Sequence, residues 1–472
     1  MMLRLFAFTP LALLLYTFLS IPASAEDFVS AVAAPAEGFL QTEGSVLAEG
    51  SSLAEGSLLA EGSLLVEDSV LAEGSLSAEG SLTEEAMDTT TLSVISIADN
   101  VHVALGQGRA TMAMIEGPEG LVIIDSLSSE DAAARVMSAF RDISARPVAA
   151  VVLTHLHHDH SGGLRVAAEG NVPVYSRAAS VTSDGTGINT FPHGAASADG
   201  DAPLAHITSR QPIRVRHPVT VAGIDLELVA AHGDDDQQLW LWYPEKGVLF
   251  SGDAFYTSFP AIHALQDPVR ESRDWLATLD AMLEQSPRFL VSSHGYPIVG
   301  QEQSISALKQ YRDTIALLLE ETLAGIEQGM GPEDLVAAIR LPPELAGQPF
   351  LDERYARLPW AIRAIYADRR GWFDGNPSNL APLPPVELSA RIADLAGGPD
   401  VLLENGLLAL DNGDYGWAAQ LADHLLNLAP EHAAARHMKA DALVGLAEHT
   451  STLPARDFYL RVAKELRRSV GE

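Results

Sequence analysis

The sequence predicts a sandwich of two β-sheets with helices on its outer faces (αββα), followed by an all-helical region. Short runs of β-type residues fall into two clusters, at 101–105, 111–116, 120–125 and 148–153 and at 213–229, 239–243 and 247–250. A helix-like stretch at 129–143 interrupts the first cluster. Clustered strands with helices between them favour two packed sheets over a single parallel sheet.

The region after about residue 301 shows apolar residues at intervals of three and four, which is typical of amphipathic helices. We expect helices at 304–328, 354–369, 402–410, 415–429 and 432–447. The last three resemble stacked antiparallel helices of the tetratricopeptide type. The proline-rich run at 381–385 is a candidate boundary within this region.

Composition limits the classes of function. The chain has 472 residues, enough for two or three compact units, and its net charge is -33. Such a charge argues against a nucleic-acid partner, because phosphates would be repelled. The chain contains no cysteine, so any zinc ion must be held by His, Asp and Glu.

The N-terminus has the features of a secretory signal peptide. Arg4 precedes the apolar run 5–18, and Ala23-Ser24-Ala25 offers a small-residue cleavage site. We expect residues 1–25 to be removed and the mature protein to be periplasmic or secreted. The alternative is an uncleaved membrane anchor, but the apolar run is short for a span. No later apolar stretch reaches transmembrane length without charges, so no stable membrane span is expected after signal removal.

Residues 26–90 are dominated by a six-residue acidic repeat, in which Glu recurs at every sixth position from Glu43 to Glu85. A period of six is also found in β-helices, but so few units would form little more than two coils. Gly and Ser in nearly every unit favour a flexible, low-complexity acidic linker.

The segment 154–163 predicts a metal site. It follows the apolar run 148–153, ends in Gly162-Gly163, and carries four ligand-type side chains within six positions, namely His155, His157, Asp159 and His160. Imidazoles two residues apart can share one metal, while the Asp and the following His turn to a second. Nitrogen and oxygen ligands suit zinc with an open position for water. We therefore predict two Zn²⁺ per chain, with Asp159 serving both as a ligand and in catalysis.

Further ligands are expected where other strands end. Asp253 closes an apolar run and is positioned to bridge two metals, and His294 closes the next run as the last ligand. Asp125 is expected to hold the ligand loop by hydrogen bonds. Between these residues the chain offers both His232 and Asp234, and the residue pattern alone leaves that choice open.

These motifs resemble those of the metallo-β-lactamase fold and, within it, the alkylsulfatase family, which cleaves sulfate esters such as dodecyl sulfate. The loop 154–163 carries the first resemblance. The more selective strings lie in the helical region, at 341–345, 371–380, 383–385, 396–398, 413–419 and 458–460, and include Trp-Phe-Asp-Gly-Asn-Pro at 372–377. The resemblance covers about 370 residues and implies a catalytic domain at 91–300 and an all-helical dimerisation domain at 301–472.

The resemblance also informs the ligand set. The family has a metal-binding glutamate nineteen residues before its bridging glutamate, and Asp234 lies nineteen residues before Asp253. This spacing favours Asp234 over His232 as the ligand.

The chain departs from the family in other ways. Both glutamates are aspartates here, and an arginine associated with sulfate binding, expected shortly before Val269-Arg270, is missing. No counterpart of the family's C-terminal sterol-carrier-like domain is expected after Glu472.

The resemblance implies an exported binuclear zinc hydrolase of alkyl sulfates that uses a metal-bound hydroxide, and a homodimer formed through the C-terminal helices. Arg270 and Arg273 are candidate contacts for the anionic ester, with solvated helix positions as the alternative. Tyr256, His263 and Tyr296 are candidate proton donors. Two other functions stay open: a metallo-β-lactamase-type hydrolase of lactones, β-lactams or thioesters, and a non-catalytic dimeric zinc-binding scaffold.

Overall fold

The computed structural model describes residues 91–170, 172–177, 210–212, 215–235, 237–262, 265 and 270–471. The predicted signal peptide (1–25) and acidic linker (26–90) lie outside the described residues, as does His263.

The first sheet has seven strands in sequence order. They are β1 (Ser93–Ala98), β2 (Val101–Leu105), β3 (Met112–Gly117), β4 (Gly120–Ile124), β5 (Val148–Val152), β6 (Val174–Ser176) and β7 (Arg210–Pro212). The pairs from β1 to β4 are antiparallel, whereas those from β4 to β7 are parallel. Helix α1 (Glu130–Ile143) connects β4 to its parallel neighbour β5, and the Ser129 side chain caps it by accepting from Ala132 N.

The second sheet has six strands. In spatial order they are β13 (Ile298–Val299), β12 (Phe289–Ser292), β11 (Val248–Gly252), β10 (Gln238–Tyr243), β9 (Ile224–Ala231) and β8 (Arg216–Val221). The predicted block 213–229 contains a tight hairpin, because Ala222 and Gly223 both adopt positive φ between β8 and β9. Helix α4 (Ser272–Glu284) joins the parallel strands β11 and β12.

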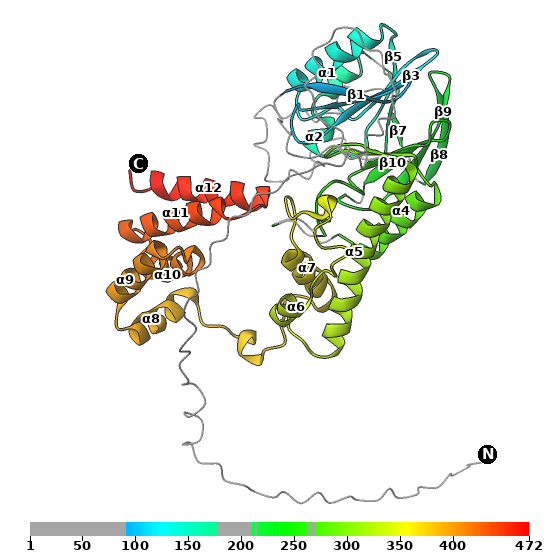
Figure 1. Cartoon of the computed structure of the whole chain (residues 1–472). Helices are drawn as coiled ribbons and strands as arrows, with labels where there is room; N and C mark the ends of the chain where they lie inside the picture. The colour runs from blue at the N-terminus through cyan, green and yellow to red at the C-terminus, as the bar shows by residue number, and fades with distance from the viewer. Residues whose placement is uncertain are drawn as a thin grey trace, which may run out of the picture. The chain divides into compact units, whose positions relative to one another are not determined.

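The two sheets share one apolar core, and each carries helices on its other face. Val122, Val152, Leu228 and Phe250 belong to the core between the sheets. A second core joins the first sheet to α1, and a third joins the second sheet to α4 and later helices. Figure 1 shows α1 and α4 on opposite sides of the sheets. The predicted αββα sandwich is confirmed.

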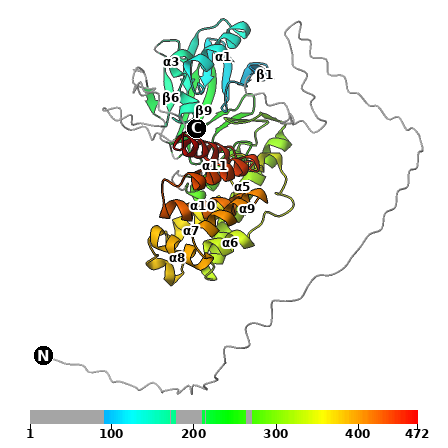
Figure 2. The ribbon, with the colours of Figure 1, turned by 90° about the vertical axis from the view of Figure 1, so that its left-hand side faces the viewer.

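The rest of the chain is helical. It comprises α5 (Gln301–Glu327), α6 (Pro332–Ala338), α7 (Leu358–Arg370), α8 (Pro385–Ala396), α9 (Pro399–Asp411), α10 (Tyr415–Leu428), α11 (Ala433–Glu448) and α12 (Leu453–Arg468). Helices α5 to α7 pack into the same core as α4. Helices α9 to α12 each pack against the next, and Figure 2 shows α9, α10 and α11 side by side. No helix in the described part of the chain has the length and apolar character needed to cross a bilayer.

Candidate metal centre

Asp125 fixes the loop that follows β5. The residue adopts a positive φ of 57° directly after β4, which turns its carboxylate toward the neighbouring strand end. Its Oδ1 accepts from Thr154 N at 2.7 Å, and its Oδ2 lies 3.1 Å from His160 Nδ1 and accepts from Ser293 Oγ at 3.2 Å. One buried carboxylate therefore orients the start of the loop, a histidine ring and the end of β12, as the sequence predicts for this residue.

The paired glycines let the short helix α2 (His158–Ser161) approach the backbone after β4. A Cβ on Gly163 would lie 2.3 Å from Ser126 O and 2.4 Å from Ala133 Cβ. In the same place, both the amide and the hydroxyl of Ser126 donate to His160 O. Any larger residue at position 163 would push the ligand-bearing loop away from the sheet.

The structure brings all seven predicted ligands together. They form three groups whose ligand atoms lie within 4.8 Å of one another: His155, His160 and Asp253; Asp159, His160 and His294; and His157, Asp234 and Asp253. Asp253 lies at the middle, because its Oδ2 is 3.2 Å from Nε2 of His294 and 3.6 Å from Nε2 of both His155 and His160. This is the position that a ligand shared by two cations requires.

The donor set fits divalent cations. His160 Nε2 and Asp253 Oδ1 are buried and have no hydrogen-bond partner among the described residues. Leaving such atoms unsatisfied costs free energy unless a cation takes them. Four imidazoles and three carboxylates without a thiolate match the nitrogen and oxygen ligands of zinc-type hydrolase sites.

In the metal-free chain, the pKa values of the ligand-type side chains depend on one another. Burial, with the nearby His160 and His157, lowers the pKa of His155 well below its usual value. Burial also opposes the charged form of His160, but Asp159 and Asp253 outweigh it and raise the pKa to about 10. Burial acts to raise the pKa of Asp253, yet His294, His160 and His155 hold it well below its usual value. A cation binding here must therefore displace a proton from His160, whereas His155 is already neutral.

Among the described residues, the groups that could hold a metal ion include Asp234 but not His232. Asp234 groups with His157 and Asp253. The His232 ring instead has Nε2 3.3 Å from Nη2 of Arg177 and Nδ1 4.0 Å from Oδ2 of Asp274. The geometry thus agrees with the choice that the family spacing suggested.

Arg270 holds Asp234 in place. Its Nε donates to Asp234 O at 2.7 Å, its Nη2 lies 2.8 Å from Asp234 Oδ1, and its Nη1 donates to Ala261 O at 2.6 Å. With both side chains buried, the guanidinium is engaged by the protein itself. We therefore do not retain Arg270 as a substrate contact, and Arg273 is exposed at the start of α4.

The candidate proton donors lie in different surroundings. Tyr256 is buried, its hydroxyl accepts from Ala261 N at 2.6 Å, and burial raises its pKa well above the usual value. Its ring lies edge-on to that of His294, with 6.3 Å between centroids. Tyr296 is half-buried two residues beyond His294.

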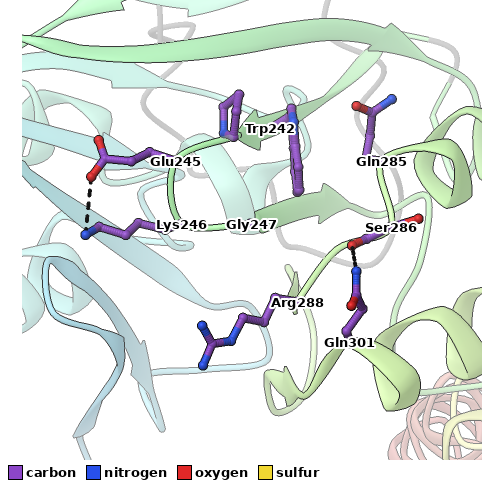
Figure 3. A pocket seen from close by; sticks show the side chains of 9 residues that line it. Trp242, Glu245, Lys246, Gly247, Gln285, Ser286, Arg288 and Gln301 are labelled. Atoms are coloured by element: carbon purple, nitrogen blue, oxygen red, sulfur yellow. Dashed lines mark hydrogen bonds and ion pairs between the residues drawn. The ribbon is translucent and has the colours of Figure 1, made fainter.

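A separate hollow of about 480 Å³ lies at the other end of the β10–β11 hairpin. Figure 3 shows its lining, which includes Trp242, Lys246, Arg288 and Gln301. It shares no residue with the ligand groups, and its lining contains no histidine or aspartate.

Comparison with known proteins agrees with this architecture. Residues 105–294 match the family model described as metallo-beta-lactamase superfamily, and residues 331–469 match the one described as alkyl sulfatase dimerisation. A linear primary-alkylsulfatase from Pseudomonas sp. is 31% identical over 386 residues, which cover 75% of this chain and 73% of the relative. This chain belongs to the alkylsulfatase family.

Other alkylsulfatases extend the likeness to solved structures. An (R)-specific secondary-alkylsulfatase from Pseudomonas sp. is 30% identical over 80% of this chain and 63% of its own length. The solved structure of a stereoselective inverting sec-alkylsulfatase from Pseudomonas sp. superposes with a TM-score of 0.68 at 28% identity, covering 80% of this chain and 66% of that one. The chain thus spans about two thirds of these two relatives.

Two residues beside the centre of this alkylsulfatase-family chain were not foreseen from the sequence. Asp235 Oδ2 lies 3.7 Å from His157 Nε2, and Arg177 contacts His232. Asp235 was visible only as one of three consecutive aspartates. Arg177 follows a strand of three residues that the pattern of apolar residues did not reveal.

Proposed function

We propose that this protein hydrolyses sulfate monoesters of aliphatic alcohols at the centre around Asp253. The observation that carries the proposal is this cluster of seven ligand-type side chains in a chain 31% identical to a linear primary-alkylsulfatase. Water is the second substrate, so the reaction yields the alcohol and hydrogen sulfate.

We further propose zinc as the metal and two ions per chain. The seven residues of the three groups would hold the two ions, with Asp253 between them: His155, His157, Asp159, His160, Asp234, Asp253 and His294. Cations at such a site supply Lewis acidity and lower the pKa of water toward neutrality. Asp125 keeps the His160 ring oriented, and Arg270 keeps Asp234 oriented, so that the ligands are in place before the ester arrives.

The helical region supports a homodimer. It matches the alkyl sulfatase dimerisation family, and its helices and the connection after α7 carry large apolar side chains that face solvent in the single chain. Leu395 is 85% exposed, Trp372 77% and Leu408 58%. Large exposed apolar side chains in a region that matches a dimerisation family support an interface there. Light scattering of the purified protein should give twice the mass of one chain, and a monomer at micromolar concentration would contradict this part of the proposal.

Export to the periplasm or the medium completes the proposal, on the basis of the charged, apolar and small-residue segments at 1–25. Mass determination of the N-terminus after expression with its own leader tests it. A mature chain beginning near Glu26 supports export, whereas a chain retaining Met1 in the cytosolic fraction contradicts it.

The enzyme proposal is tested by offering dodecyl sulfate and nitrocefin side by side to the zinc-loaded protein. We expect sulfate release from dodecyl sulfate and little ring opening of nitrocefin. Brisk ring opening without sulfate release would favour the lactamase-type alternative. Bound zinc without hydrolysis of either compound would favour the scaffold alternative.

A further inference from the structure

The edge of the metal centre is acidic, which creates a problem for a negatively charged ester. The Asp159 side chain is 39% exposed and that of Asp235 21% exposed. Their carboxylates repel an approaching sulfate ester, so recognition calls for a positive side chain in addition to the cations of the centre. In the sequence, the segment 178–209, which follows Arg177, and the segment 263–269, which precedes Arg270, contain neither Lys nor Arg.

Most arginines around the centre are already neutralised. Arg270 is buried against Asp234, and the Arg109 guanidinium lies 2.9 Å from Asp457. Arg177 differs, because no carboxylate among the described residues lies within ion-pair distance of it. Its guanidinium contacts the carbonyl of Ala231 and Nε2 of His232. In a chain of net charge -33, this half-buried guanidinium keeps its charge available for an external anion.

Arg177 lies at the same edge of the sandwich as the metal ligands. Strand β6 runs parallel to β5, with Tyr175 opposite Val152, so the residues after both strands leave the sheet on the same side. The ligand loop follows β5, and Arg177 follows β6. From there its guanidinium reaches Ala231, the last residue of β9, at the start of the connection that carries Asp234.

The His232 ring orients the guanidinium. With Nε2 accepting from Arg177, the ring proton is on Nδ1 and faces Asp274 Oδ2 at 4.0 Å. The His232 amide donates to Thr278 Oγ1 at 3.0 Å, which fixes the backbone beneath the ring. The side chain of His232 is 35% exposed, so this arrangement opens to solvent beside the centre.

We propose that Arg177 binds the sulfate group of the ester, with His232 and Asp274 as positioning residues. A guanidinium presents a planar set of N–H donors that matches the oxygens of a sulfate group, and its charge is permanent. The inference rests on the proposed function, since it names the residue that recognises the anionic part of that substrate. Arg177 thereby supplies the positive side chain that the acidic edge of the metal centre requires.

The test compares steady-state kinetics of zinc-loaded full-length variants on dodecyl sulfate. Because a contact to sulfate persists through the reaction, Arg177→Met should raise KM about tenfold to a hundredfold, with a much smaller change in kcat. The inhibition constant of dodecane sulfonate, an anion that lacks the scissile ester bond, should rise by a similar factor. In Arg177→Lys, the KM and the inhibition constant should both lie between those of the wild type and those of Arg177→Met. The zinc content of both variants should stay at the wild-type value.

Arg165→Met is the matched control. It removes one positive charge from α3 (Leu164–Ala167), where the side chain is 60% exposed and lies against Glu130. Its KM for dodecyl sulfate should equal that of the wild type. If only the net charge of the protein mattered, Arg165→Met and Arg177→Met would raise KM by the same factor, and that result would overturn the assignment.

Wild-type kinetics and sulfonate inhibition in Arg177→Met would overturn the inference while leaving the proposed function intact. If the wild type cleaves no sulfate ester, calorimetry with dodecane sulfonate still decides: weaker binding by Arg177→Met supports the anion site, and equal binding refutes it. Should Arg177→Met fold poorly, His232→Gln provides the second variant. A KM unchanged in that variant and in Arg177→Lys would also count against the inference.

Discussion

The buried pair of Arg270 and Asp234 gives the sharpest stability prediction. Their side chains are 7% and 4% exposed, and the contacts of the guanidinium to described residues include three of 2.6 to 2.8 Å, to Asp234 O, Asp234 Oδ1 and Ala261 O. In Arg270→Met the Asp234 carboxylate loses its charged partner while it stays buried. Breaking a buried pair in this way typically costs about 3–5 kcal/mol. We expect a loss of that size in the unfolding free energy of the metal-free protein.

Urea unfolding of the metal-free variants, followed by tryptophan fluorescence, measures this effect. The double variant Arg270→Met with Asp234→Asn should be more stable than Arg270→Met alone, because it no longer contains an uncompensated carboxylate. Arg273→Met, an exposed change on the next helix, should stay within about 0.5 kcal/mol of the wild type. A loss below about 1 kcal/mol in Arg270→Met, or strict additivity in the double variant, would refute the reasoning.

Three further predictions concern the ligands, the loop and the dimer. Asp234→Ala should lose zinc, whereas His232→Ala should retain it; elemental analysis showing the reverse would make His232 the ligand. Gly163→Val should abolish zinc binding, because its Cβ meets Ser126 O at 2.3 Å; a normal zinc content would show that the loop can shift at little cost. Leu395→Asp should give a monomer in light scattering with its helix content intact, since it places a charge in the proposed interface; an unchanged dimer mass would place the interface elsewhere.

Local patterns predicted the fold and much of the centre. The four ligand-type residues at 155–160 are close in sequence, so their convergence needs only one loop. Asp253 and His294 were predicted because each closes an apolar run, and the structure shows that these runs are parallel neighbours, β11 and β12, which end at one edge of the sheet. The choice of Asp234 needed the family spacing, since nothing local distinguishes it from His232.

The remaining features could not be predicted from local patterns, and two of them depend on contacts between residues far apart in the sequence. Arg270 was considered a substrate contact, but its side chain turns inward to a carbonyl 36 positions away in the chain. Arg177 bonds to Ala231 across 54 positions and between the two sheets, which no local pattern encodes. Helix α8 was missed because its start at Pro385 coincides with a proline-rich run that we interpreted as a boundary. Proline is in fact well suited to the first turn of a helix.

The central claim is that this centre, loaded with zinc, cleaves sulfate esters. Its most direct test is sulfate release from dodecyl sulfate by wild-type protein that has been stripped with a chelator and then reconstituted, with Asp253→Asn treated in the same way. We predict no release from the stripped protein, recovery on adding about two equivalents of zinc, and no recovery in Asp253→Asn. The claim would be contradicted if the stripped wild type, or Asp253→Asn after reconstitution, released sulfate as fast as the reconstituted wild type.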